Sequence, residues 1–168
     1  MPTKVTASSI WRVQEGLERA LRSISTADGF NTSPTVRVGV PALDGVQNGD
    51  LPLIAFEFGD MTPDVEQTGA DAPSHGLIRF AWPALVYGYI RTTGAARDLN
   101  QSATALLLDV LAAVYDDETL PDGAGQGTVL LVQPGAVAWD MESFAKDGRG
   151  WFAAEFVLVF DVERSGTP

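Results

Sequence analysis

Hydrophobic residues recur every three or four positions in two stretches of the chain, which is the spacing of an amphipathic helix. The first stretch begins at Ser8 or Ser9, either of which can cap a helix. Its apolar stripe comprises Ile10, Val13, Leu17, Leu21 and Ile24. Asp28 and Gly29 are expected to end this helix, because glycine adopts the left-handed conformation that closes many helices.

The second stretch predicts a longer helix from Asp98 to Asp117, around which the rest of the fold is organised. Asp98 is the expected N-cap, with Gln101 three residues later, an arrangement related to the capping box. The apolar stripe comprises Ala103, Leu106, Leu107, Val110, Leu111 and Val114, whereas Asn100, Thr104 and Asp109 fall off it. Core packing accounts for this pattern.

Alternating hydrophobic residues predict three strands between the two helices. Thr35–Val40 and Leu53–Phe58 flank a turn-rich loop and are expected to form a hairpin. Leu77–Thr92 predicts one long strand. Within it Pro83 marks a bulge, an edge or a bend, because proline cannot donate a hydrogen bond to the ladder.

Two more strands are expected after the long helix, at Gly127–Gln133 and Trp151–Val162. The last strand is apolar on both faces. One face carries Phe152, Ala154, Phe156, Leu158, Phe160 and Val162, and the other carries Trp151, Ala153, Val157 and Val159. Such a strand lies in the centre of a sheet or is covered by another subunit.

Two polar segments, Gly59–Gly76 and Pro134–Gly150, predict long loops. We expect both loops to stay mobile until a partner orders them, because the first is too poor in apolar residues to bury itself. Residues 165–168 are expected to form a disordered tail. The chain is therefore predicted to be a single domain, residues 1–168.

The order of these elements is α-β-β-β-α-β-β, which predicts an α/β protein, more narrowly α+β. Its sheet is expected to be twisted and mainly antiparallel, with the two helices packed on one face.

Composition excludes several classes of function. The chain has 22 acidic and 11 basic residues, and a formal charge of −11 repels nucleic-acid backbones and anionic membrane surfaces. There are no cysteines, which excludes disulfides and thiolate metal ligands. The N-terminal residues lack a signal peptide, and nowhere do eighteen apolar residues run together. Synthesis in the cytosol is expected.

Candidate catalytic chemistry is sparse. His75 is the only histidine, and no Gly-x-Ser-x-Gly elbow supplies a nucleophile for it, so a loop histidine is the default interpretation. Gly123, Gly125 and Gly127 resemble a phosphate-binding loop, but the required strand and helix are in the reversed order. A flexible turn is the better interpretation, and no cofactor is expected.

Pairs of carboxylates leave a hard-cation site conceivable, either at Asp60 and Asp64 or at Asp140 and Glu142. No spacing matches a calcium loop. Scattered pairs are expected by chance in a chain this acidic, so we assign no metal site.

The candidate partner-docking residues form two groups. Asp116, Asp117 and Glu118 place negative charge at the C-terminus of the long helix, where the helix dipole is already unfavourable to it. They form either a solvated face or an acidic patch directed at a basic partner. The second group, Trp139, Asp140 and Glu142, lies in the segment predicted to be the second long loop.

The element order resembles the tail terminator, or tail completion, proteins of long-tailed bacteriophages over roughly residues 9–163. The stretches that carry the resemblance are IWRVQEGLERALRSI, LPLIAFEFGD, GLIRFAWPALVYGYIR, ALLLDVLAAVYDDETL and WFAAEFVLVFDVER. The resemblance implies a hexameric ring on the head-facing end of the tail tube. Such a ring ends tube polymerisation and presents a surface to the head-tail connector or neck protein.

The sequence therefore predicts a structural virion protein, not an enzyme, that is assembled in the host cytoplasm and located at the head-tail junction. DNA would pass through the ring without specific binding, since both are negatively charged. Another neck or tail-completion protein is the nearest alternative. An alternative of a different class is a small hydrolase or metal-dependent enzyme that uses His75 and nearby carboxylates.

Overall fold

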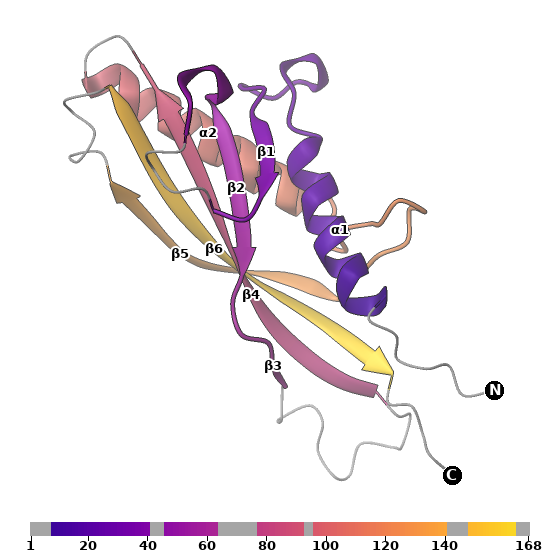
Figure 1. Ribbon diagram of the computed structural model, residues 1–168. Coiled ribbons are helices and arrows are strands. Elements are labelled where there is room, and N and C mark those ends of the chain that lie inside the picture. The colour runs from indigo at the N-terminus through magenta and orange to yellow at the C-terminus, as the bar shows by residue number, and fades with distance from the viewer. Residues whose placement is uncertain (1–7, 41–45, 64–76, 93–95, 141–147, 164–168) are drawn as a thin grey trace, which may run out of the picture.

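The computed structural model describes residues 8–40, 46–63, 77–92, 96–140 and 148–163. Within these residues two α-helices pack on one face of a mixed, mostly antiparallel sheet, as predicted (Figure 1). The elements in chain order are α1 (Ser8–Arg22), β1 (Thr35–Val38), β2 (Leu53–Phe58), β3 (Thr62–Pro63), β4 (Leu77–Arg91), α2 (Ala96–Asp116), β5 (Leu131–Asp140) and β6 (Arg149–Glu163). This α+β order confirms the predicted fold class.

The strands lie in the order β1-β2-β4-β6-β5, and β3 pairs with the end of β4 beyond β2. The centre of the sheet is the antiparallel pair β4 and β6, which are in register from Leu77 opposite Glu163 to Arg91 opposite Arg149. The last strand is therefore central, one of the two placements that its two apolar faces predicted.

The main core lies between the helices and the even-numbered positions of the long strands. Its largest fully buried side chains include Leu17 and Leu21 of α1, Leu106 of α2, and Phe152, Phe156 and Phe160 of β6. Full burial of a side chain of this size contributes roughly 1.5–3 kcal/mol relative to exposure. The apolar stripes of both helices thus pack as their spacing predicted.

The prediction of a hairpin between the first two strands is wrong, because β1 and β2 are parallel. Parallel strands need a crossover, and the long segment between Val38 and Leu53 supplies it. This segment places Val46 against Leu53 and Tyr89 in a second, smaller hydrophobic cluster. A tight hairpin turn would leave that face of β2 uncovered.

Pro83 lies inside β4 without interrupting it. Its carbonyl accepts a hydrogen bond from the Gly59 amide (2.9 Å), on the side of β4 where β2 ends and β3 begins. In an antiparallel strand the N–H and C=O of one residue point the same way. The missing N–H of Pro83 therefore falls at the break between β2 and β3.

The predicted ends of the helices need correction. Asp98 lies in the first turn of α2, which begins at Ala96, and is not the N-cap. Helix α1 ends at Arg22, whereas Gly29 closes a separate 3-10 helix, Thr26–Asp28, with a φ of 93°. In the last turns of α1, Glu18 and Arg22 form an i,i+4 salt bridge at 2.7 Å.

The predicted bounds of the fifth strand are also wrong. Strand β5 begins at Leu131 rather than at Gly127 and includes Pro134–Asp140, a segment predicted to be loop. A register shift between Pro134 and Val137 explains the error, because a bulge accommodates proline and glycine within a strand. The predicted loop also overlaps the start of β6 at Arg149 and Gly150. Its residues 141–147 lie outside the described residues.

Two smaller differences concern the other strands. The first strand ends at Val38, two residues early, and Val38 is 65% exposed at the sheet edge rather than buried. The predicted loop Gly59–Gly76 contains β3, and its residues 64–76 lie outside the described part of the chain, as do residues 165–168.

Candidate docking surfaces

The sheet face opposite the helices carries a half-buried apolar strip. It consists of Leu85 and Tyr87 on β4 and Trp151, Ala153 and Val157 on β6. The rings of Tyr87 and Trp151 lie 6.4 Å apart. Side chains at these positions point away from both helices, because strand residues alternate between the two faces. Tyr87 and Trp151 also pack against the smaller cluster that contains Val46, so the strip is partly exposed among the described residues.

Polar groups border the strip. The Tyr87 hydroxyl donates a hydrogen bond to Glu57 (3.0 Å), and burial and the Glu57 carboxylate together raise the pKa of Tyr87. Near the far end of β4, Arg79 forms an ion pair with Asp161 across to β6 (2.9 Å). The open face is therefore mixed in character, because Glu155 lies opposite Leu85 within the strip and Glu57, Arg79 and Asp161 lie around it.

Strand β5 forms one edge of the sheet and exposes large hydrophobic side chains. Leu131, Val137 and Trp139 are 37%, 40% and 45% exposed. Natural proteins commonly protect a long edge strand with lysine, proline or a bulge. The sequence of β5 contains no lysine or arginine, and only Pro134 and the adjacent bulge interrupt the edge.

Helix α2 also exposes a hydrophobic side chain, because Leu108 is 54% exposed. Farther along this helix, the ring of Tyr115 lies 6.0 Å from Phe156 of β6. We call Val137 and Trp139 the β5 edge patch.

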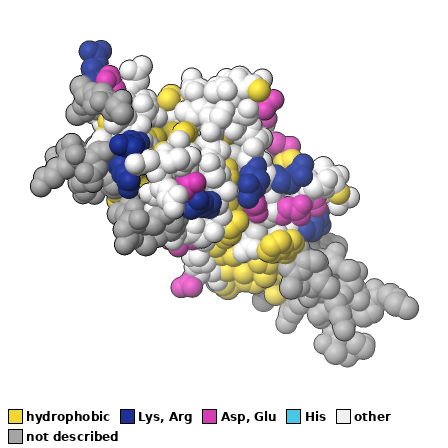
Figure 2. All heavy atoms as spheres, turned by 45° about the horizontal axis from the view of Figure 1, so that its top comes forward, with side chains coloured by type: hydrophobic (Ala, Val, Ile, Leu, Met, Phe, Trp, Pro, Cys, Tyr) yellow, Lys and Arg dark blue, Asp and Glu magenta, His cyan; other side chains and the backbone are white. Residues whose placement is uncertain are grey.

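Figure 2 shows how side-chain types are distributed on one face of the molecule. Hydrophobic side chains gather in one broad area there, while acidic and basic side chains are interspersed over the rest. Contiguous exposed apolar surface is a feature of interaction sites, whereas single exposed hydrophobic residues are normal. The gathering of hydrophobic side chains on this face therefore favours a docking role.

The acidic candidates at the end of α2 are exposed, as a solvated face or a docking patch requires. Asp117 also has a local role, because its carboxylate accepts hydrogen bonds from the hydroxyl (2.6 Å) and the amide (3.0 Å) of Thr119. These two bonds lower the pKa of Asp117. Asp116 and Asp117 line a shallow hollow of about 200 Å³ together with Arg19 of α1.

The glycine-rich segment after α2 is a turn organised by Asp122, in agreement with the interpretation against a phosphate loop. Asp122 is buried, and one carboxylate oxygen accepts the amides of Ala124 (2.9 Å) and Gln126 (3.0 Å). The other oxygen accepts the Arg12 Nε of α1 at 2.7 Å. The turn is thus tied to the first helix.

These bonds make Asp122 a pH-sensitive support of the fold. The Gln126 amide, foremost, together with Arg12 and the Ala124 amide, lowers the pKa of Asp122 below its ordinary value of 3.8. A lowered folded-state pKa stabilises the fold above the unfolded-state pKa, and the contribution is lost as the pH falls through the folded-state pKa. Asp122→Asn should therefore lower the melting temperature at neutral pH, and the difference from wild type should shrink below about pH 3.8.

Melting curves recorded from neutral to acidic pH measure that difference. Arg12→Gln is the matched variant, because it removes the ion pair but leaves the amide of Gln126 in place. Its effect should be the smaller of the two. A gap between wild type and Asp122→Asn that stays constant down to the most acidic pH would contradict this account.

Several predicted residues cannot be placed. His75, Asp64 and Glu142 lie outside the described residues, and Asp60 is exposed after β2. Trp139 and Asp140 belong to an edge strand instead of a loop. Among the described residues no cluster of three or more histidine, aspartate or glutamate side chains is arranged to bind a metal ion.

Comparison with known proteins adds no assignment. No family model matches the chain, and no curated protein matches it. In the part of the chain that is described, no helix has the length and apolarity needed to span a bilayer.

Proposed function

We propose that this protein is the tail terminator of a long-tailed bacteriophage. It caps the head-facing end of the tail tube as a ring, ends polymerisation of the tube, and forms the surface that joins the tail to the head. It acts by self-assembly and docking rather than by catalysis. Its partners are further copies of itself, the tail tube protein and the head-tail connector or neck protein.

The observation that carries the proposal is the apolar surface left by the fold. One face of the sheet is covered by helices, while the strip on the other face and the β5 edge patch remain partly exposed. Strands β1 and β5 lie at opposite edges of the sheet. A contact between different surfaces of neighbouring copies is heterologous, and it closes into a ring when the rotation between copies allows it.

Charge is consistent with this function. A formal charge of −11 disfavours binding to DNA, so a ring of such chains presents a repulsive wall to DNA that passes through it. The exposed acidic residues Asp116, Asp117 and Glu118 are the proposed contact with a basic surface on the tube or the neck.

Substitution in the β5 edge patch should abolish assembly without unfolding the protein. Val137→Asp places a charge on the edge strand β5, at a side chain that is 40% exposed. The folded monomer should tolerate this charge, whereas an apolar contact between copies should not. We expect normal circular dichroism and a melting temperature within a few degrees of wild type, with loss of phage-forming activity when purified protein is added to a lysate that lacks the native chain.

Trp11→Ser is the matched control, because Trp11 is 64% exposed on α1, away from β5. This variant should complement as wild type does. Full complementation by Val137→Asp would exclude the patch as an assembly surface.

The position of the chain in the virion tests the function itself. Electron microscopy of particles carrying a labelled copy should place it at the head-tail junction, and particles lacking it should have tails of irregular length or unattached heads. Absence of the label from that junction would refute the proposal.

A further inference from the structure

The open face of the sheet carries two carboxylates on either side of a leucine. In the register of the sheet, Leu85 of β4 lies opposite Glu57 of β2 on one side and opposite Glu155 of β6 on the other. Residues directly opposite each other share a face, so all three side chains point away from the helices. Two strand spacings separate the backbones of the glutamates, which is about 10 Å. We call Glu57, Leu85 and Glu155 the acidic row.

Neighbouring groups position both carboxylates. Glu57 is exposed and accepts a hydrogen bond from the Tyr87 hydroxyl (3.0 Å). Glu155 is half-buried, and its stem lies against Gly135 in the bulge of β5, where a methyl group added to the glycine would meet Cβ and Cγ of Glu155. Both carboxylates are therefore oriented by the sheet and remain accessible in the described part of the chain.

No described cation neutralises the acidic row. Glu57 and Glu155 take part in none of the four ion pairs among the described residues. The nearest arginine in the register is Arg37 of β1, opposite the residue two positions before Glu57. Its guanidinium is already paired with Asp50 at 2.8 Å.

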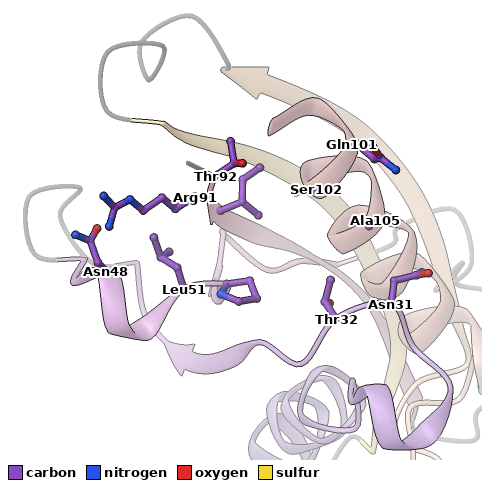
Figure 3. A pocket seen from close by; sticks show the side chains of 11 residues that line it. Asn31, Thr32, Asn48, Leu51, Arg91, Thr92, Gln101, Ser102 and Ala105 are labelled. Atoms are coloured by element: carbon purple, nitrogen blue, oxygen red, sulfur yellow. The ribbon is translucent and has the colours of Figure 1, made fainter. Parts of the chain in front are cut away.

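The other charges of this face lie toward the ends of the long strands. Arg79 forms an ion pair with Asp161 at 2.9 Å near one end. At the other end Arg91 and Arg149 are opposite each other, six residues from the acidic row, which is roughly 20 Å along a strand. Figure 3 shows Arg91 extending beside Asn48 at a hollow of about 670 Å³ at the end of β4. These groups flank the acidic row at a distance.

The segments outside the described residues add few cations. Residues 41–45 and 64–76 contain no lysine or arginine. Residues 141–147 contain one lysine, Lys146, and connect β5 to β6 at the end of the strands that carries Arg149. The sequence therefore places no lysine or arginine beside the acidic row on any strand that forms it.

A partner that covers this face has to neutralise the two carboxylates. Removing a carboxylate from water is costly unless a cation pairs with it. The rings of Tyr87 and Trp151 lie 6.4 Å apart on the same face. Such surroundings favour arginine, whose guanidinium stacks on aromatic rings and whose stem packs on apolar surface. A sheet face suits a side chain presented by a protein, whereas small molecules bind in concave pockets.

We infer that the open face docks a partner protein through an arginine side chain, whose stem lies on Leu85 and whose guanidinium donates to Glu57 and Glu155. A planar guanidinium can bind a carboxylate through two parallel hydrogen bonds. Two carboxylates are too few ligands for a calcium ion, which takes roughly six to eight oxygens. The inference concerns the isolated chain and does not rest on the proposed function.

A short peptide tests the inference on the whole chain. We expect acetyl-Leu-Arg-Leu-amide to shift the backbone amide signals of Glu57, Leu85, Tyr87 and Glu155 in two-dimensional NMR spectra. The dissociation constant should be millimolar, the order expected for a ligand that makes a single anchoring contact. The same peptide with citrulline in place of arginine is neutral and nearly identical in shape. It should bind about tenfold more weakly, because it cannot form the charge-assisted bonds.

Glutamine variants separate recognition of the charge from apolar binding alone. The double variant Glu57→Gln and Glu155→Gln should bind both peptides with similar, weakened affinity. Glutamine keeps the shape of the side chain and an acceptor oxygen for Tyr87, so circular dichroism should be unchanged. Glu15→Gln is the matched control, because Glu15 lies on α1, across the sheet from the acidic row, and it should bind as wild type does.

Several outcomes would overturn the inference. Equal binding of the arginine and citrulline peptides by the wild type is one, and a preference for arginine that survives in the double variant is another. Shifts confined to the acidic end of α2, or no shifts at saturating peptide, would also overturn it.

Calcium and Lys146 are the remaining alternatives. Calcium chloride should leave the four amide signals unchanged, and tighter binding of calcium than of the arginine peptide would overturn the assignment. Lys146→Gln should bind the arginine peptide as wild type does. A large gain in affinity would show that this lysine already occupies the acidic row. Docking on this face can fail while the protein still locates to the head-tail junction, so the two proposals are tested separately.

Discussion

Asp109→Ala is expected to lower the free energy of unfolding by about 2–4 kcal/mol, because it removes a buried acceptor that several donors share. Asp109 is 2% exposed, and one carboxylate oxygen accepts the Asn31 amide (2.9 Å) and the Asn31 side chain (2.7 Å). The other oxygen accepts the Thr32 hydroxyl at 2.6 Å. These bonds fasten the segment between α1 and β1 to α2.

Denaturant unfolding followed by circular dichroism measures the loss. Thr104→Ala is the matched control on the same helix, since Thr104 is exposed and bonds only the local carbonyl of Asn100 among the described contacts. It should change stability by no more than about 0.5 kcal/mol. Asp109→Asn keeps an acceptor oxygen and should fall between the two. A change in Asp109→Ala as small as in the control would show that water replaces the carboxylate.

Gly88→Ala is expected to destabilise the fold by about 2–3 kcal/mol through overpacking. Gly88 of β4 is paired with Phe152 of β6, and an added methyl group would meet the ring of Phe152. Phe152 is fully buried at 0% exposure, so the ring has little room to move. The measurement is again the free energy of unfolding.

Gly49→Ala is the control for Gly88, because nothing lies within 4 Å of the methyl group that it would add. This variant should remain within about 0.5 kcal/mol of wild type. Phe152→Leu in the Gly88→Ala background should restore room, so the double variant should lose less stability than the two single losses combined. Strict additivity would disprove the proposed clash.

The faces of the strands were predictable, but their neighbours were not. The bounds of β2 were predicted to the residue, and β4 and β6 nearly so, because alternation records which side of a strand is buried. Alternation contains no information about direction, so the parallel pairing of β1 and β2 was missed. Strand β5 was missed in part because proline and glycine also occur at bulges.

Single residues show the same limit. Asp109 falls off the apolar stripe of its helix, which suggests a solvated position, but its partners Asn31 and Thr32 come from a distant segment. Gly16 lies inside α1, where glycine weakens a helix, yet it permits close approach of the Leu120 carbonyl. The residues that line the hollow of about 670 Å³ at the end of β4 come from segments widely separated in the chain. Such contacts depend on the tertiary fold and leave no local signal.

The long central pair of strands sets the order in which the chain can fold. The shortest loop that joins β4 to β6 contains all of α2 and β5, since the nearest residues that pair are Arg91 and Arg149. Closing such a loop costs conformational entropy before any pairing is gained. Proteins dominated by such non-local pairing fold in milliseconds to seconds rather than microseconds. Until β6 is added, the apolar edge of β4 stays unpaired, and association between unfinished chains competes with folding.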